Sequence, residues 1–210
     1  MILRPRASAQ WCAVLLLIAP LALAEVTAQA LFFTALNPDL ITSCCGSLFS
    51  PEMGGVAAEV AGLNPAVSLA ALAVSGLALL GTGLRYWRRG RGGGLFALMA
   101  ALTFSIALAA IVSGVALYVY EHPHHHCPFC LLKSGHDFVG YGLYVPLFAA
   151  TALALGAGLI EVWRSTPSLT AIITHQGPRL AGIALLLFGL FYGFATWLVL
   201  RSNLILLGTN

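Results

Sequence analysis

Four long runs of apolar residues dominate the chain, and no charged side chain interrupts any of them. They extend over about residues 66–84, 95–120, 138–160 and 180–200. A helix needs about 20 apolar residues to cross the hydrocarbon layer of a membrane, and each run is about that long. The strands of a membrane barrel would instead be short and would alternate between polar and apolar residues. The pattern therefore predicts four transmembrane helices.

An earlier apolar stretch, from Trp11 to about Ala35, is interrupted by Pro20, Glu25 and Gln29. Arginines precede it and Ala22-Leu23-Ala24 follows its first apolar part, an arrangement that also fits a cleavable signal peptide. Apolar residues resume after Gln29 and complete a possible span, so we favour an uncleaved helix. The predicted fold class is an all-α integral membrane protein, a bundle of five transmembrane helices, or four if the first stretch is cleaved.

Composition supports a membrane protein. Of the 210 residues, 60% are hydrophobic and only 8% are charged, whereas soluble domains carry about 25% charged residues. Most of the chain therefore faces the lipid bilayer or other helices, and residues 1–210 are expected to form a single transmembrane domain. No basic stripe is interleaved with aromatic residues, which argues against a nucleic-acid partner.

The positive charges predict the orientation. Eight of the ten Lys and Arg residues fall before the first span or in two of the connections: Arg4, Arg6, Arg85, Arg88, Arg89, Arg91, Arg164 and Arg179. Cytoplasmic loops collect Lys and Arg, so the N-terminus is expected in the cytoplasm and the C-terminus outside. Segments 37–65 and 121–137 then lie on the outer, periplasmic side of the cell inner membrane. Tyr118, Tyr120 and Tyr141 suit an outer aromatic belt.

Four of the five cysteines lie in these two outer segments. Cys44 and Cys45 are adjacent in the first, while Cys127 and Cys130 form a C-x-x-C in the second. An oxidising compartment permits disulfides there, so structural crosslinks are the simplest interpretation. The fifth, Cys12, lies near the start of the first apolar stretch and is interpreted as an inert apolar side chain.

The C-x-x-C has features that a structural crosslink does not need. Pro128 fits the first position of a helix, which predicts that Cys127 caps the helix of the fourth span. Backbone N–H groups and the helix dipole would favour a thiolate there, and nearby imidazoles would add positive charge. A lower pKa enlarges the nucleophilic thiolate fraction. Cys127 is therefore a candidate nucleophile, with Cys130 on the same face of the helix.

Two motifs resemble a known family. They are Cys127-Pro128-Phe129-Cys130-Leu131-Leu132 and Cys45-Gly46-Ser47-Leu48-Phe49-Ser50, the latter followed by Ala61-Gly62-Leu63-Asn64-Pro65. Together they resemble the vitamin K epoxide reductase family, the quinone-linked membrane thiol oxidoreductases, over about residues 30–160. The resemblance implies that Cys45 exchanges with Cys127 and that Cys130 faces a quinone. The chain differs from the family pattern in that the upstream partner, Cys44, is directly adjacent to Cys45.

Histidines around the C-x-x-C support a different prediction, that of a metal site. They are His122, His124, His125, His126 and His136. Imidazole and thiolate ligands together suit Cu or Zn, and Cys127 and Cys130 would supply the thiolates. Cys44 and Cys45 could add two more. A metal-binding or metal-delivery membrane protein is therefore an alternative.

The sequence thus favours a membrane thiol–disulfide oxidoreductase that exchanges electrons between outer cysteines and a quinone. Its catalytic residues would be Cys127, Cys130, Cys45 and Cys44, and its expected partner is a periplasmic thiol protein or a larger membrane complex. The charge-free interiors of the four runs argue against a transporter, because transport pathways normally contain polar or ionisable groups. A small structural subunit of a membrane complex is the third possibility.

Overall fold

The computed structural model describes residues 19–31, 55–123, 125–162 and 170–204. Cys12, Cys44, Cys45 and His124 lie outside these ranges. The chain divides into two units, 1–43 and 44–210, and each is described by itself. In the first unit residues 19–31 form a helix, and within the described ranges of the second all regular structure is helical.

Four helical stretches of the second unit are long and apolar enough to cross a membrane: Pro65–Arg89, Gly93–Tyr120, Val139–Val162 and Ile173–Arg201. They correspond to α4 (Pro65–Arg89), α5 (Gly93–Ala110) with its continuation through the π-helical segment η2 (Ile111–Val115) and α6 (Ala116–Tyr120), α7 (Val139–Val162) and α8 (Thr170–Arg201). The short helix α3 (Val56–Ala61) precedes α4. The four predicted spans are confirmed as helices, and four helices of this length and composition are typical of a multi-pass membrane protein. The fifth span is not confirmed.

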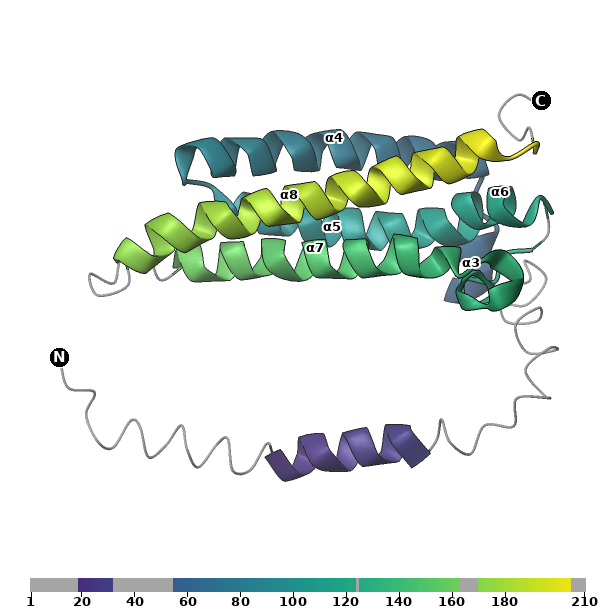
Figure 1. Ribbon diagram of the computed structural model, residues 1–210, viewed down its shortest axis with the longest axis horizontal. Coiled ribbons are helices and arrows are strands. Elements are labelled where there is room, and N and C mark those ends of the chain that lie inside the picture. Colours follow the sequence, from purple (N-terminus) through teal and green to yellow (C-terminus); the bar gives the residue numbers. More distant parts are fainter. Residues whose placement is uncertain (1–18, 32–54, 124, 163–169, 205–210) are drawn as a thin grey trace. The chain divides into compact units, whose positions relative to one another are not determined.

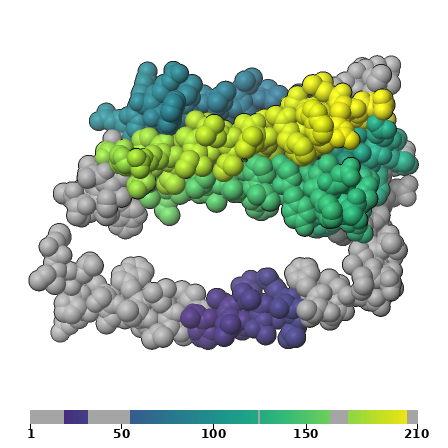
Figure 2. Space-filling view, in the orientation of Figure 1, coloured from purple at the N-terminus to yellow at the C-terminus, as the bar shows by residue number. Residues whose placement is uncertain are grey.

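The four long helices pack as a bundle. In Figure 1, α8 lies across α4 and α7, and α5 packs between α4 and α7. The space-filling view shows α8 on the face of the unit, between α4 and α7 (Figure 2). The most extensive helix–helix contacts are those of α7 with α8 and with α5. The segments that follow α5 and precede α7 are therefore attached to two helices that pack closely against each other.

Small residues allow α5 and α7 to approach closely. A Cβ atom on Gly158 would overlap the Ala97 side chain and lie 2.9 Å from the carbonyl oxygen of Gly93. Membrane helices gain their association energy from such close packing, because lipid is as apolar as the helix surfaces. The same contact brings the end of α7 against the start of α5.

Glu161 joins these two helix ends. Its carboxylate accepts hydrogen bonds from the backbone N–H of Gly92, at 2.9 Å, and of Gly94, at 3.1 Å. The first N–H groups of a helix have no partner within the helix, and the dipole favours an anion beside them. A side chain from α7 therefore caps α5.

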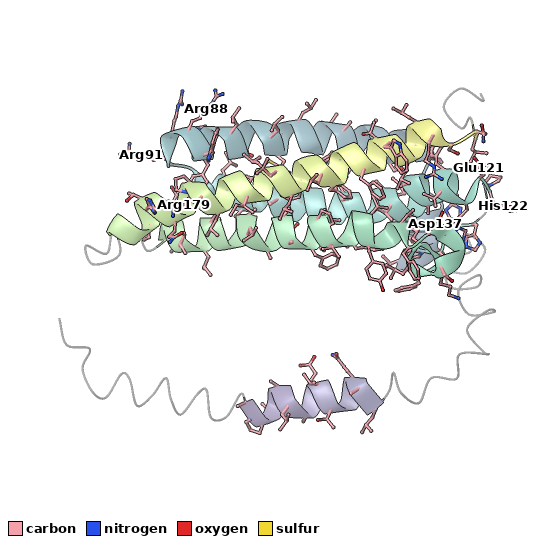
Figure 3. All side chains as sticks on the ribbon, in the orientation of Figure 1. Arg88, Arg91, Glu121, His122, Asp137 and Arg179 are labelled. Atoms are coloured by element: carbon pink, nitrogen blue, oxygen red, sulfur yellow. The ribbon has the colours of Figure 1, made fainter. Side chains whose placement is uncertain are left out.

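Charged residues separate to the two ends of the bundle. Figure 3 shows Arg88, Arg91 and Arg179 at one end and Glu121, His122 and Asp137 at the other. The C-x-x-C lies between α6 and α7, at the same end as Glu121 and Asp137. The separation agrees with the charge pattern from which the orientation was predicted, and the orientation itself remains a prediction.

Candidate functional site

The C-x-x-C lies in a compact turn and not at the start of α7. Residues 130–132 form a 3-10 helix, η3 (Cys130–Leu132), and a second one, η4 (Ser134–His136), follows before α7 begins at Val139. The prediction that Cys127 caps the helix of the fourth span is therefore wrong.

The backbone explains why that helix starts late. Lys133 is extended, with φ −88° and ψ 155°, and it ends η3. Asp137 and Phe138 have φ of 52° and 54°, in the left-handed region. An α-helix cannot continue through such residues, because L-residues form right-handed helices. The dipole of α7 consequently does not act on Cys127.

The two cysteines of the turn have different surroundings. Both carry thiols. Cys127 is buried, with 1% of its surface exposed, whereas Cys130 is partly exposed. A reagent or a protein partner that approaches the turn from water therefore meets Cys130 first.

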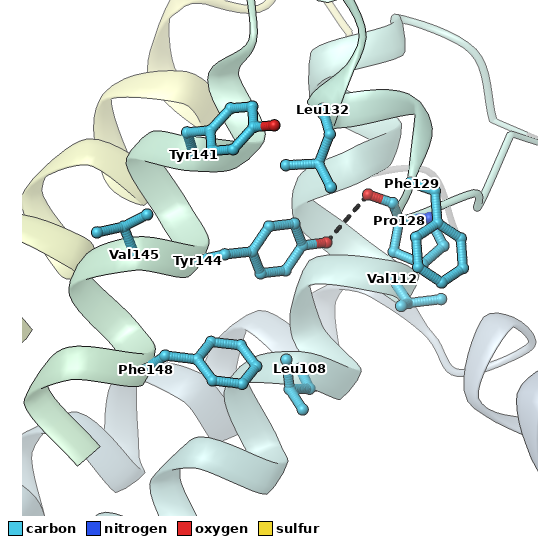
Figure 4. Close-up of a pocket in the computed structure, with 9 residues that line it drawn as sticks. All are labelled: Leu108, Val112, Pro128, Phe129, Leu132, Tyr141, Tyr144, Val145 and Phe148. Carbon is cyan, nitrogen blue, oxygen red and sulfur yellow. Dashed lines mark hydrogen bonds between the residues drawn. The ribbon is translucent and has the colours of Figure 1, made fainter. Parts of the chain in front are cut away.

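Two tyrosine hydroxyls hold the main chain of the turn. Tyr120, the last residue of α6, donates to the carbonyl oxygen of Cys127 at 2.6 Å. Tyr144, on α7, donates to the carbonyl oxygen of Pro128 at 3.1 Å (Figure 4). The two bonds tie consecutive peptide units to different helices. The position of Cys127 therefore depends on both α6 and α7.

His126 connects the turn to the π-helical segment. Its side chain is 8% exposed, and its Nδ1 atom lies 3.2 Å from the carbonyl oxygen of Val112. A carbonyl only accepts hydrogen bonds, so Nδ1 carries the proton in this contact. Short π-helical segments inside α-helices frequently occur at functional sites. Here the segment offers a carbonyl to the residue directly before Cys127.

The residues after Cys130 rest directly on α7. Leu131 is fully buried, and a Cβ atom on Gly140 would lie 3.0 Å from the carbonyl carbon and oxygen of Leu131. Backbone atoms cannot move aside as readily as the end of a flexible side chain. Gly140 therefore allows η3 to pack against the first turn of α7.

An apolar cavity of about 600 Å³ adjoins the turn (Figure 4). Its walls come from α5, η2, the turn and α7, and consist of Leu108, Val112, Pro128, Phe129, Leu132, Tyr141, Tyr144, Val145 and Phe148. Pro128 and Phe129, the two residues between the cysteines, form part of the wall. Small-molecule sites typically have volumes of about 300–1,000 Å³ and mostly apolar walls. The cavity is thus suited to a lipophilic molecule held against the turn that carries the two cysteines, although neither cysteine is among its lining residues.

Histidines surround Tyr120 on the other side of the turn. The Tyr120 ring centroid lies 4.3 Å from that of His125 and 4.5 Å from that of His136. These three residues and His122 line a cavity of about 250 Å³. Burial lowers the pKa of His125, and so does the proximity of His136, His122 and His126. Both effects favour the neutral form of His125.

The predicted metal site receives no support from the described part of the chain. Within that part, no three His, Cys, Asp or Glu side chains are grouped so that they could hold a metal ion. His124, Cys44 and Cys45 lie outside it. The participation of these three residues, in metal binding or in exchange with Cys127, remains a prediction.

No known protein family, curated protein or solved structure matches the chain. The resemblance to the vitamin K epoxide reductase family therefore still rests on the two cysteine motifs. Sequence analysis also missed Tyr120 and Tyr144 as residues that hold the turn. Tyr120 was assigned only to an aromatic belt, and its position directly before the histidine-rich segment was the available signal.

Proposed function

We propose that the chain is a membrane thiol–disulfide oxidoreductase that exchanges electrons between Cys127, Cys130 and a quinone in the apolar cavity. The observation that carries this proposal is that Pro128 and Phe129, between the two cysteines, form part of the cavity wall. A lipophilic substrate in the cavity would lie beside the C-x-x-C without entering water. A quinone in the bilayer would reach it from the lipid.

The chemistry balances without a further reactant. Cys127 and Cys130 together lose two electrons and two protons as their S–H bonds break and one S–S bond forms. The quinone takes up both electrons and both protons and becomes a quinol. The reverse reaction would reduce the disulfide. In either direction the tyrosine bonds to Cys127 and Pro128 hold the main chain of the turn in place.

The other redox partner would approach from the aqueous side. We propose that this side is the periplasm of a cell with an inner membrane, where a thiol protein or a larger membrane complex exchanges with the cysteines. Cys45 or Cys44 would carry electrons between that partner and Cys127, as the family resemblance implies. Exchange of this kind proceeds through a mixed disulfide.

The test uses purified, reduced protein in nanodiscs with a short-chain quinone as the oxidant. Val145 lines the cavity, and Val145→Phe is expected to fill part of it. Overpacking typically costs about 1–3 kcal/mol, so quinone-dependent loss of thiols should slow by about tenfold or more. Oxidation by water-soluble diamide, which does not need the cavity, should be unchanged. The disappearance of free thiols measures both rates.

Val74→Phe is the matched control, because Val74 is a similarly exposed valine on α4 away from the cavity. It should oxidise like the wild type with both reagents. Equal quinone rates in the two variants, or no oxidation of the wild type by quinone, would remove the proposal. Stoichiometric copper or zinc that is lost when His122, His125 and His136 are replaced would favour the metal-site alternative instead.

A further inference from the structure

Three consecutive residues of the turn, 126–128, are each hydrogen-bonded to a different helical element. Their partners are Val112 of η2, Tyr120 of α6 and Tyr144 of α7. A single hydrogen bond contributes little net stability in a protein, and local openings that break a few such bonds occur within the native state. The turn is therefore held closed by a small set of bonds that can break together.

Two of these three partners also line the apolar cavity (Figure 4). Val112 is a wall residue, and its carbonyl oxygen accepts the bond from His126. Tyr144 is a second wall residue, and its hydroxyl donates to the carbonyl oxygen of Pro128, which lines the cavity as well. A molecule in the cavity therefore contacts the residues whose bonds keep the turn closed.

The wall of the cavity is complete only while the turn is closed. Pro128, Phe129 and Leu132 come from the turn, and the rest of the wall comes from α5, η2 and α7. Movement of the turn away from these helices would remove one side of the cavity. A ligand that contacts both sides consequently favours the closed turn, because it binds that conformation better than the open one.

Cys127 cannot react from the closed turn. Its side chain is 1% exposed, and in thiol–disulfide exchange its sulfur must meet a sulfur of the partner directly. Beyond Cys130, the fully buried Leu131 lies against Gly140 of α7. Pro128 follows Cys127 directly, so a movement that brings the Cys127 sulfur to water also displaces Pro128 from the cavity wall.

We propose that the turn is a gate: a lipophilic molecule in the apolar cavity holds it closed over Cys127, and Cys127 exchanges with an aqueous partner only while the cavity is empty. This inference rests on the proposed function for the identity of the occupant, a quinone or quinol. The two half-reactions then alternate. The quinol leaves with two electrons and two protons from the thiols, and a dithiol partner afterwards returns the same number to the Cys127–Cys130 disulfide as it forms its own disulfide.

The test measures how fast a water-soluble maleimide alkylates Cys127 in the full chain in nanodiscs, with every other cysteine replaced by Ser. The cavity probe is menadiol dimethyl ether, a lipophilic quinol ether that exchanges no electrons. A ligand of the closed state reduces the open population by the factor 1 + [L]/Kd. At about ten times the ether concentration that halves the rate, alkylation should therefore be about elevenfold slower than without ether.

The same chain with Cys130 as its only cysteine is the matched control. Cys130 is partly exposed in the closed turn, so its alkylation does not need opening and should be nearly independent of the ether. Equal slowing of both cysteines would overturn the gate, because the ether would then be acting on the reagent or the bilayer. A Cys127 rate that the ether does not lower, or that reaches a plateau above the expected value, would overturn it too.

The bonds of the turn are tested in the chain that keeps only Cys127. Tyr144→Phe loses the bond to Pro128 but keeps its ring in the cavity wall, so alkylation without ether should be about two- to twelvefold faster, the net value of one hydrogen bond. The ether should still slow it. Tyr192→Phe, which loses a bond to Leu72, should react like the unchanged chain. Equal rates in the two variants would contradict the role of Tyr144.

A pair of variants at His126 separates its hydrogen bond from its bulk. Asn carries an N–H donor bonded to Cγ, the place of Nδ1 in histidine, and His126→Asn should keep the slow alkylation of Cys127. His126→Leu has no donor and should react faster by the same two- to twelvefold as Tyr144→Phe. If both variants react alike, the bond to Val112 does not hold the gate.

Failure of the gate can be told apart from failure of the proposed function, because the ether takes no part in redox chemistry. Protection of Cys127 by the ether, in a protein whose thiols quinone does not oxidise, would support the gate and remove the oxidoreductase. Oxidation by quinone, together with alkylation of Cys127 that the ether leaves unchanged, would overturn the gate alone.

Discussion

At the scale of single residues, the two cysteines of one turn differ mainly in access. The side chain of Cys127 is 1% exposed, and its main-chain carbonyl oxygen accepts a hydrogen bond from Tyr120. The side chain of Cys130 is partly exposed. An alkylating reagent must contact the sulfur atom, so burial slows the reaction regardless of thiolate content. Opening of the turn would have to precede any attack by or on Cys127.

We expect a maleimide to react at least about tenfold faster with Cys130 than with Cys127, since a local opening that costs about 1.4 kcal/mol already slows a reaction tenfold. Each cysteine is measured as the only thiol of the chain, with the remaining cysteines replaced by Ser. In denaturant the two rates should converge. Equal rates in the native protein would show that the turn exposes both sulfur atoms.

The histidine cluster predicts a pH dependence of stability. The pKa of His125 is lowered by burial and by the neighbouring histidines, while unfolded histidine titrates near about 6.5. Between these values the unfolded chain binds more protons than the folded one, so stability rises with pH. The contribution of neutral His125 is therefore present above about pH 6.5 and is lost as pH falls through its folded pKa.

The melting temperature should accordingly fall between about pH 7.5 and pH 5.5, and it should fall less in His125→Gln, which cannot titrate. Circular dichroism in a buffered detergent solution measures both. Gln176, exposed on α8, provides a control through Gln176→Ala, which removes no titratable group and should keep the wild-type difference between the two pH values. An identical fall in wild type and His125→Gln would contradict the lowered pKa.

Residue types could be predicted from the sequence, but most of their contacts could not. Cys127, Cys130 and the histidines were identifiable because such side chains are rare in an apolar chain. The carbonyl oxygens of Cys127, Pro128 and Val112 accept hydrogen bonds from Tyr120, Tyr144 and His126, and such contacts leave no mark in the sequence because every residue has a carbonyl.

At the scale of elements, apolar length was a reliable guide to the helices and a poor guide to their ends. The run 180–200 marked the core of α8, yet the helix begins at Thr170 and includes Pro178. The sequence placed the start of the fourth span too early, because Pro128 suited the first position of a helix. The left-handed backbone of Asp137 and Phe138 delays the start of α7 to Val139. The π-helical segment η2 lies inside the uncharged run 95–120, whose composition gave no indication of it.

The cap that Glu161 provides is another element-scale feature, since Glu161 lies 69 positions after Gly92 in the chain. Glu161→Ala removes both hydrogen bonds to the start of α5 and should lower the free energy of unfolding by about 1–3 kcal/mol. Glu161→Gln retains one acceptor oxygen and should show an intermediate loss. Thermal unfolding in detergent measures the series.

Glu59→Ala is the matched control for this series, because Glu59 is exposed on the short helix α3. A surface change of this kind usually alters stability by less than about 0.5 kcal/mol. A loss in Glu161→Ala no larger than in Glu59→Ala would show that the contact between α7 and the start of α5 does not depend on the carboxylate.

At the scale of the whole molecule, three of the arginines and the C-x-x-C lie at opposite ends of the second unit. Arg88, Arg91 and Arg179 are at one end, and Glu121 and Asp137 are at the other (Figure 3). The C-x-x-C and both cavities beside it share the second end. If positive loops remain in the cytoplasm, the thiols face an oxidising compartment, where disulfide exchange is possible.

Orientation is therefore the property on which the proposed function depends most directly. We expect a membrane-impermeant maleimide to label Cys130 in intact cells when it is the only cysteine of the chain. Arg91→Cys, in a chain without other cysteines, should be labelled only after the inner membrane is permeabilised, because it lies at the opposite end. Each variant serves as the control for the other, because both single cysteines should be labelled once the membrane is permeabilised. If Arg91→Cys is labelled in intact cells and Cys130 is not, the thiols face the reducing cytoplasm, and exchange with a periplasmic partner is impossible.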